Sequence, residues 1–493
     1  MSHFLATKSL ERLLHEASEG EDRLHRVLGP VQLTALGVGA IIGAGIFVAT
    51  GAAAHQVAGP SLTMSYVVAG FTCALAALCY AEFASMVPVA GSAYTYAYAT
   101  LGELFAWMIG WDLILEYAVG SATVANGWSG YLQSALSAVG VSLPAAISGP
   151  PLVYDTATGH LVHTDGWVNL PAVLVVTAVT AVLVKGIRET AGFNTLMVAV
   201  KLAAVLFVIV VGAMYVTPAN WHPFAPFGWW GVSFFGVPLL GQTGAGGQPV
   251  GMFAGAAIVF FAYIGFDSVS THAEEAHNPR RDVPIGIIAS LLICTGLYIA
   301  VVAVLTGMVP YDHIDIDAGV SVAFSEVGLH WAEFIIAAAG VAGITSVLLV
   351  LMLSAPRVLL AMARDRMVPP GFFGAVHPVW RTPWKSTVLV GAFVALLAGF
   401  LPIDALLHMT NIGTLFAFVV VCGAVLVMRR ARPDAPRPFK APLYPFVPIA
   451  GIVMCLLLMF SLPVENWYRL IGWMAIGLVL YFAYGYHHST LRE

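Results

Sequence analysis

The amino-acid sequence predicts an all-α polytopic membrane protein with about twelve transmembrane helices. Of the 493 residues, 59% are apolar and only 10% are charged, and the mean hydropathy is +0.87. Soluble domains carry about 25% charged residues, so this composition excludes an ordinary soluble fold. Apolar runs of about 20 residues, each long enough to cross a hydrocarbon core of about 30 Å, recur along the whole chain.

Each apolar run predicts one helix, and polar or Pro/Gly-rich breaks separate the runs. In chain order we expect spans at 31–57, 61–87, 103–138, 167–187, 193–217, 249–274, 284–310, 330–366, 385–401, 404–430, 441–462 and 466–487. The outer connections 139–166 and 218–248 contain no Lys or Arg and are rich in Trp, Pro and Gly. Their aromatic residues are expected at the level of the lipid headgroups.

Basic residues gather in the segments that these spans place on one side. Of the 21 Lys and Arg residues, all except Lys201, Arg357 and Arg469 lie in the expected inner segments. Cytoplasmic loops are enriched in Lys and Arg, so we expect a multi-pass protein of the cytoplasmic membrane with both termini cytoplasmic. The opening stretch has no secretory signal, and the first span is expected to direct insertion. The inner residues are Lys8, Arg12, Arg23, Arg26, Lys185, Arg188, Arg280, Arg281, Arg364, Arg366, Arg381, Lys385, Arg429, Arg430, Arg432, Arg437, Lys440 and Arg492.

Two of the expected spans contain glycine in the middle of an otherwise apolar run. The first carries GVGAIIGAGIF from Gly37, and the sixth carries FFAYIGFDS from Phe260. Interruptions at matching positions of two halves are typical of inverted repeats whose broken helices hold a substrate at mid-membrane. The alternative is that these glycines only allow helices to pack closely.

This pattern predicts how the chain is organised. We expect a cytoplasmic segment 1–30, a five-helix repeat 31–217, an outer loop 218–248 and a second five-helix repeat 249–430. Residues 431–493 would add two helices and a short tail.

An interrupted helix frees backbone N–H and C=O groups that lipid cannot satisfy, so the break must line a cavity or bind a polar ligand. A zwitterion supplies both kinds of partner. The outer half of the first span would present N–H groups and a positive dipole end to a carboxylate. Freed carbonyls in the sixth span would receive an ammonium. The expected residues are Ile42, Gly43, Ala44 and Gly45 on the first span and Phe261, Ala262 and Ile264 on the sixth.

Ionisable residues inside the spans are candidates for function because burying them among helices is costly. Lys201 lies in the fifth span, where it either exchanges a proton as the protein changes conformation or reaches toward the membrane surface. Glu116, in the third span, either stabilises a substrate ammonium or is a structural carboxyl. Asp112 lies one turn earlier on the same face. Asp267, after the sixth-span break, either joins this polar path or braces the helix.

Other polar residues have several possible roles. Thr345 and Ser346 of the eighth span either bond their own helix or face a cation position beside the first span. The remaining charged residues near inner span ends are expected to form an inner gate or ion-pair surface: Glu82, Glu103, Glu274, Glu275, Arg280 and Arg281, with Arg357, Arg364, Asp365 and Arg366. The five cysteines and His55, His272 and His313 lack metal-ligand spacing, so we expect no metal or cofactor.

Several long segments resemble the amino acid–polyamine–organocation transporters, and within them the cationic amino acid transporter family and its bacterial relatives. The matching segments are GVGAIIGAGIF, YAEFASMVPVAGSAYTYAYATLGELFAWMIGWDLILEYAV from Tyr80, FFAYIGFDSVSTHAEEAHNPRRDVPIGI from Phe260 and SAPRVLLAMARD from Ser354. The resemblance implies a LeuT-type fold of five plus five inverted helices followed by two more.

The same resemblance implies roles for particular residues. Gly43, Ala44 and Gly45 would bind the substrate carboxylate, and Phe261, Ala262 and Ile264 would line the amine side, with Phe261 also acting as a gate. Lys201 would be the proton-coupling residue of the fifth span. It would lie beside the carbonyls of Gly39 and Ile42 and beside the eighth span. Ala44 departs from relatives that have Ser or Thr there, which removes a hydroxyl contact to the carboxylate.

The expected function is secondary active transport of an L-amino acid by alternating access, coupled to protons. Leu351 and Met352 near the expected pocket favour a small neutral substrate. The alternatives are an amino acid exchanger, a carrier of arginine or lysine, and a receptor that binds an amino acid without transporting it. An enzyme is not expected, because no nucleophile elbow or phosphate-binding loop occurs. The expected partners are the amino acid, a proton and the lipid bilayer, and nothing indicates nucleic acid.

Overall fold

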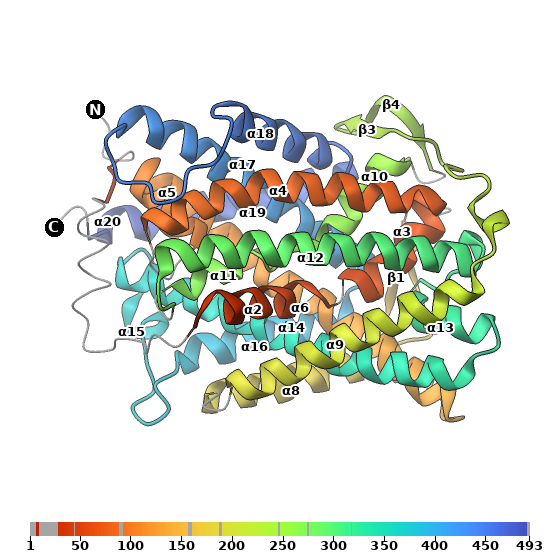
Figure 1. Cartoon of the computed structure of the whole chain (residues 1–493). Coiled ribbons are helices and arrows are strands. Elements are labelled where there is room, and N and C mark those ends of the chain that lie inside the picture. Colours follow the sequence, from red (N-terminus) through yellow and green to blue (C-terminus); the bar gives the residue numbers. More distant parts are fainter. Residues whose placement is uncertain are drawn as a thin grey trace.

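The long helices run roughly parallel in one bundle (Figure 1). The computed structural model describes residues 6–8, 28–43, 45–87, 92–155, 160–186, 190–244, 247–273, 276–316 and 318–490. The long uninterrupted helices are α4 (Leu62–Met86), α6 (Glu103–Ala138), α8 (Leu170–Lys185), α9 (Thr190–Gly212), α12 (Pro279–Met308), α14 (His330–Arg364), α16 (Trp384–Phe400), α17 (Ile403–Ala431), α18 (Phe446–Met459) and α19 (Val464–Leu480). Several begin at or just after a proline, which needs no helical N–H partner in the first turn.

Seven segments of the described chain are long and apolar enough to cross a membrane. Three further apolar helices, α8, α16 and α18, are shorter. One of the seven, Pro30–Met86, contains both the interrupted first span and α4. The seven segments are Pro30–Met86, Leu196–Tyr215, Met252–Ser270, Pro279–Met308, His330–Arg364, Ile403–Ala431 and Val464–His488.

Two helices are interrupted, at the glycine-containing segments. In the first, α2 (Pro30–Ile41) ends before an extended Ile42, and the chain resumes as η2 (Gly45–Ala49), α3 (Thr50–Ala53) and η3 (Ala54–Ala58). In the second, α10 (Met252–Val259) tightens into the 3₁₀ turn η7 (Phe260–Tyr263). A left-handed Gly265, with φ +121°, then leads to α11 (Ser268–Thr271).

The connections contain structure that the sequence pattern did not predict. Strands β1 (Leu152–Asp155) and β2 (His160–His163) form one antiparallel pair. Strands β3 (Gly231–Phe234), β4 (Val237–Thr243) and β5 (Pro249–Val250) form an antiparallel sheet in the order β3-β4-β5. The short helical pieces are η4 (Gly59–Ser61), α5 (Ser92–Thr100), α7 (Ala145–Ser148), η5 (Ala213–Tyr215), η6 (Pro218–Trp221), η9 (Tyr311–His313), α13 (Gly319–Glu326), α15 (Pro370–Phe373), η10 (Tyr481–Gly485) and α20 (Tyr486–His488).

The core of the bundle lies where α6 packs along α14 and α17, while α12 packs along α2 and α4. Helices α5, α15 and α20 lie at one end in Figure 1, and β3, β4 and α13 lie at the other. The two described ends of the chain meet at the first of these ends. The Lys8 ammonium and the Tyr94 hydroxyl bind the Asp365 carboxylate at 3.0 and 2.6 Å, and Thr490 N–H donates to the Asp365 carbonyl.

Candidate functional site: the meeting point of two interrupted helices

The two interruptions lie against each other, and glycine makes this approach possible. A Cβ atom on Gly45 would lie only 2.1 Å from the Cα of Ala262. On the other side of the crossing, a Cβ on Gly265 would lie 2.9 Å from the carbonyl oxygen of Ala40. Side chains larger than hydrogen would therefore push the two broken spans apart. These contacts support the close-packing role of the glycines, and their ligand-binding role stays a prediction.

Tyr298 of α12 joins the two interruptions. Its buried hydroxyl lies 2.9 Å from the carbonyl oxygen of Ile41 and 3.1 Å from that of Ala262, and can donate to either. One carbonyl belongs to the first interrupted span and the other to the sixth. The sequence analysis missed this residue. The sequence did contain a signal for it: a tyrosine inside an apolar span predicts a hydrogen bond, because a buried hydroxyl needs a partner.

Asn411 of α17 supports the outer half of the sixth span in a similar way. Its side-chain amide donates to the carbonyl oxygens of Ala257 and Ile258, both at 2.9 Å. These carbonyls lie in the last turn of α10, where the helix tightens into η7 and its regular hydrogen bonding ends. Asn411 was also missed, although a fully buried amide in a membrane helix indicates an interhelical hydrogen bond.

Lys201 reaches from α9 to the first interruption. Its ammonium donates to the carbonyl oxygen of Gly39 at 2.5 Å, and only 1% of the residue is exposed. Its aliphatic part packs against Gly343 of α14, where a Cβ would lie 3.0 Å from the Lys201 Cγ. The side chain therefore turns toward the interrupted helix instead of toward the membrane surface. It lies between α2 and α14, the two spans beside which the resemblance implied that Lys201 would lie.

Thr345 and Ser346 of α14 both bond their own helix. Thr345 donates to the carbonyl of Val341 at 2.7 Å and accepts a hydrogen bond from the Trp128 indole of α6 at 2.9 Å. Ser346 donates to the carbonyl of Gly343 at 3.1 Å. Ser346 therefore bonds the same glycine that Lys201 packs against, whereas Thr345 links α14 to α6.

Asp267 braces the second interruption. One carboxylate oxygen accepts from the Gly265 backbone N–H at 3.2 Å, and the other accepts from the Tyr117 hydroxyl at 3.0 Å. On the same helix as Tyr117, the carboxyls of Asp112 and Glu116 are buried. Within the described residues, both oxygens of Asp112 and one of Glu116 have no hydrogen-bond partner. Unpartnered buried oxygens of this kind can accept a proton, a water or a cationic group.

The expected carboxylate-binding and amine-binding segments are buried. Gly43 packs against Val347 of α14, and its carbonyl accepts from Phe47 N–H at 3.3 Å. Ile42 donates its N–H to Val38, the last bond of α2. Phe261 is 5% exposed, and its carbonyl accepts from Ile264 N–H at 3.2 Å. Ala44 lies outside the described residues.

The charged residues at the inner ends form structural contacts. Glu82 accepts two hydrogen bonds from Arg429 and one from Ala441 N–H, which ties α4 to α17 and the following loop. Glu103 accepts from the hydroxyls of Tyr481 and Ser489. Arg280 and Arg281 are exposed at the start of α12, and Arg357, Arg364 and Arg366 are exposed on and just after α14. Glu274 and Glu275 lie outside the described residues.

Known proteins match this chain over nearly its whole length. Residues 28–481 match the family model described as amino acid permease. The chain is 46% identical to the branched-chain amino acid permease BcaP of Bacillus subtilis, over 99% of this chain and 98% of that protein. It is 43% identical to the methylthioribose transporter of Bacillus subtilis, over 100% of both chains. It is 37% identical to the vacuolar cationic amino acid transporter 4 of Arabidopsis thaliana, over 88% of this chain and 68% of that protein.

These relatives are named as permeases or transporters, which supports the expectation that the chain is not an enzyme. The match also agrees with the apolar helices, which are those of a polytopic integral membrane protein. The chain therefore belongs to the amino acid permease family, within the amino acid–polyamine–organocation superfamily.

Proposed function

We propose that this permease carries an L-amino acid across the cytoplasmic membrane by alternating access, with the substrate bound between the two interruptions. The observation that carries this proposal is the close approach of Gly45 to Ala262, which brings the freed backbone of both spans to one place. The N–H groups of residues 43–45, which follow the Ile42 N–H that closes α2, would receive the carboxylate. The carbonyls of Phe261, Ala262 and Ile264 would receive the ammonium, with Glu116 nearby and Phe261 as a gate. Opening this site requires the Tyr298 contacts to change.

The proposed topology has twelve crossings, arranged as five plus five inverted helices of the LeuT type followed by two more. The contacts of Lys8 and Thr490 with Asp365 support an even number, because they bring both described ends of the chain to one side. The basic inner segments support cytoplasmic termini. The units 31–217 and 249–430 would be the two repeats, with 218–248 as the outer loop and 1–30 and 431–493 at the ends.

The proposed substrate is an amino acid with a small neutral side chain. The Leu351 side chain lies near Gly120 of α6, one turn beyond Glu116, so the space there is bounded by apolar atoms. The relative named as a branched-chain amino acid permease also supports a neutral substrate. A cationic amino acid is the second candidate, because Asp112 and Glu116 have unpartnered oxygens that would pair with a distant positive charge.

A binding screen would separate these candidates. A ligand stabilises the protein it binds by about 2.7 kcal/mol at a concentration of 100 times its Kd. We expect purified protein to show its largest rise in melting temperature with alanine, valine, leucine or isoleucine among the twenty amino acids. The largest rise with arginine or lysine would select the cationic candidate. Binding without any flux in proteoliposomes would select the receptor.

Lys201 is the proposed coupling residue. Its ammonium ties α9 to the carbonyl of Gly39, two residues before the end of α2. Loss of the proton would weaken this bond and release the inner half of the first span. Rebinding of the proton would restore it. Proton movement would thereby be linked to the position of the interrupted helix that binds the substrate.

We expect Lys201→Met to abolish accumulation driven by an inward proton gradient in proteoliposomes, while exchange of internal for external substrate continues. Methionine keeps much of the side-chain volume but cannot bind a proton or donate to Gly39. Lys185→Met, at the exposed inner end of α8, is the matched control and should accumulate substrate normally. Full gradient-driven accumulation by Lys201→Met would contradict the coupling role. Wild-type uptake that does not depend on pH and requires substrate preloaded inside the proteoliposomes would identify an exchanger.

A further inference from the structure

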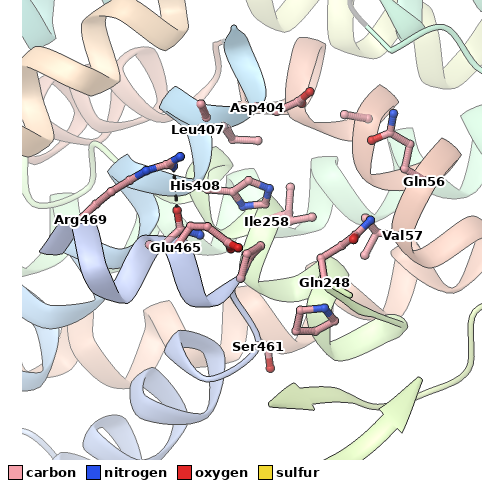
Figure 2. A pocket seen from close by; sticks show the side chains of 15 residues that line it. Gln56, Val57, Gln248, Ile258, Asp404, Leu407, His408, Ser461, Glu465 and Arg469 are labelled. Carbon is pink, nitrogen blue, oxygen red and sulfur yellow. Dashed lines mark hydrogen bonds between the residues drawn. The ribbon is translucent and has the colours of Figure 1, made fainter. Parts of the chain in front are cut away.

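A pocket lined by apolar residues and by several polar side chains lies apart from the crossing of the two interruptions. It is bounded by η3, by the loop before α10 and by the first turns of α17 and α19, and its volume is about 80 Å³ (Figure 2). Its polar and charged side chains include Gln56, Gln248, Asp404, His408, Glu465, Asn466 and Arg469. The proposed topology places these segments on the outer side, opposite the contacts around Asp365.

Three side-chain atoms around this pocket are shielded from solvent and have no hydrogen-bond partner within the described part of the chain. They are Nδ2 of Asn466, Nδ1 of His408 and Oε1 of Gln248. Asn466 is only 1% exposed. Buried polar atoms in native proteins are paired with protein, water or ligand, so three such atoms around one cavity make it suited to a polar ligand.

The orientation of the Asn466 amide follows from its neighbour. The Arg469 guanidinium donates to Oδ1 of Asn466 at 3.2 Å, and it has no hydrogen-bond acceptor to offer in return. The amide oxygen must therefore face Arg469, which leaves the NH₂ group free to donate elsewhere. Together, the guanidinium and this NH₂ group make one side of the pocket suited to a carboxylate.

The opposite side of the pocket offers acceptors. Figure 2 shows Arg469 on one side, Gln248 and Gln56 on the other, and His408 between them. The Gln248 amide oxygen lacks a donor, and the Asp404 carboxylate lines the same space at the start of α17. Glu465, beside Asn466 on α19, lines the pocket as well and adds a second carboxylate. Donors from Arg469 and Asn466, with acceptors from Gln248, Asp404 and Glu465, fit a small molecule with separated negative and positive ends.

The pocket is built on the elements that form the crossing. Ala52 of α3 and Ile258 of α10 line it, and both belong to the interrupted spans. On α17, His408 lies three residues before Asn411, whose amide holds the Ile258 carbonyl. An occupant of the pocket would therefore contact the outer halves of both spans before reaching the interruptions.

We propose that this pocket is a second, outer binding position for the transported amino acid. The substrate carboxylate would bind Arg469 and the Asn466 NH₂ group, and its ammonium would face Gln248 Oε1 and Asp404. This inference rests on the proposed function, because the same zwitterion would move from the outer position to the crossing. Arg469 supports it separately, since it is one of the three basic residues that the sequence does not place in the expected inner segments.

The test compares binding and uptake in the full-length protein, using the amino acid that stabilises it most in a screen of all twenty. We expect two molecules bound per wild-type chain and one per Asn466→Leu chain. We expect Asn466→Leu to raise the KM for uptake from outside about tenfold, the effect of losing one hydrogen bond to a charged group. Exchange measured from the inner side should change little.

Two further variants keep the test decisive. Arg469→Gln removes the charge from an exposed residue, and should raise the outer KM even if Asn466→Leu does not fold. Ser461→Ala is the matched control: Ser461 lines the same pocket but bonds the Leu457 carbonyl, so its loss should leave KM unchanged. One molecule bound per wild-type chain, with unchanged KM in the variants, would show that the pocket holds only water. Absence of any wild-type binding or uptake would instead overturn the proposed function.

Discussion

Single polar side chains from unbroken helices hold the interrupted spans in place. The Tyr298 hydroxyl lies within hydrogen-bond distance of the Ile41 and Ala262 carbonyls and donates to one of them at a time. Asn411 donates to Ala257 and Ile258, and Lys201 donates to Gly39. Each acceptor is a carbonyl in an interrupted helix, most of them in its last turn before the break. In a bilayer these carbonyls have no water to bind, so the neighbouring helix must supply the donor. At the scale of residues, the site is therefore a set of side-chain donors that bind backbone carbonyls of the interrupted helices.

Tyr298→Phe should slow transport, because its hydroxyl is the direct link between the two interruptions. We expect a loss of about 1 kcal/mol in stability and an altered maximal rate of uptake. Thermal unfolding measures the loss of stability, and uptake into proteoliposomes measures the maximal rate.

Thr306→Val is the matched control for this substitution. It also removes one buried hydroxyl–carbonyl hydrogen bond, from Thr306 to Val302 at 2.8 Å, but both residues belong to the unbroken α12. A similar loss of stability with normal transport is expected. If both variants slowed transport equally, the bridging role of Tyr298 would be wrong.

At the scale of elements, the decisive contact is between the two interrupted spans. The first span carries Gly45 at the start of η2, and the sixth carries Ala262 within η7. Their backbones approach so closely at Gly45 that a Cβ atom there would overlap Ala262. Small residues serve this purpose between membrane helices in general.

Gly45→Ala should therefore destabilise the protein by about 1–3 kcal/mol and abolish uptake, because the added methyl group would overlap the Ala262 backbone. Gly296→Ala, in the middle of α12, is the comparison. No atom lies within 4 Å of a Cβ built on Gly296, and alanine favours helix over glycine by about 1 kcal/mol. Gly296→Ala should be neutral or stabilising in the same unfolding assay. A Gly45→Ala protein with normal stability and transport would refute the close crossing.

At the scale of the whole molecule, the two ends of the helix bundle differ in their contacts. One end carries the contacts of Asp365 and Glu103 with the two described ends of the chain. The other end carries the strands β3, β4 and β5 and the pocket around Asn466. The first end joins distant segments of the chain, and the second contains buried polar atoms without a partner among the described residues.

Cysteine labelling can test this sidedness against the proposed topology. Asp165→Cys and Asp434→Cys place thiols at exposed positions before α8 and after α17. A membrane-impermeant maleimide added to intact cells should modify Asp165→Cys. It should modify Asp434→Cys only after the cells are permeabilised. Background should be low, because the native cysteines are all buried: Cys73, Cys79, Cys294, Cys422 and Cys455. Modification of both variants in intact cells would contradict the proposed arrangement.

Sequence patterns predicted the apolar helices to within a few residues, as at His330–Arg364, where 330–366 was expected. They missed α5 and the strands of the outer connections. These elements are too short to produce an apolar run of membrane-spanning length, and pairing within a loop depends on residues that are distant in sequence. The interruptions were predicted because glycine within an apolar run is a local signal.

The sequence by itself determined that the chain crosses a membrane repeatedly, which two spans are interrupted and which ionisable residues lie inside the bundle. All of these depend on the chemistry of neighbouring residues along the chain. Only the tertiary structure decided that Lys201 bonds Gly39, that Tyr298 joins both interruptions and that Asn466 and Gln248 line one pocket. Those partners lie tens to hundreds of residues apart, and no local pattern determines which helix faces bring them together.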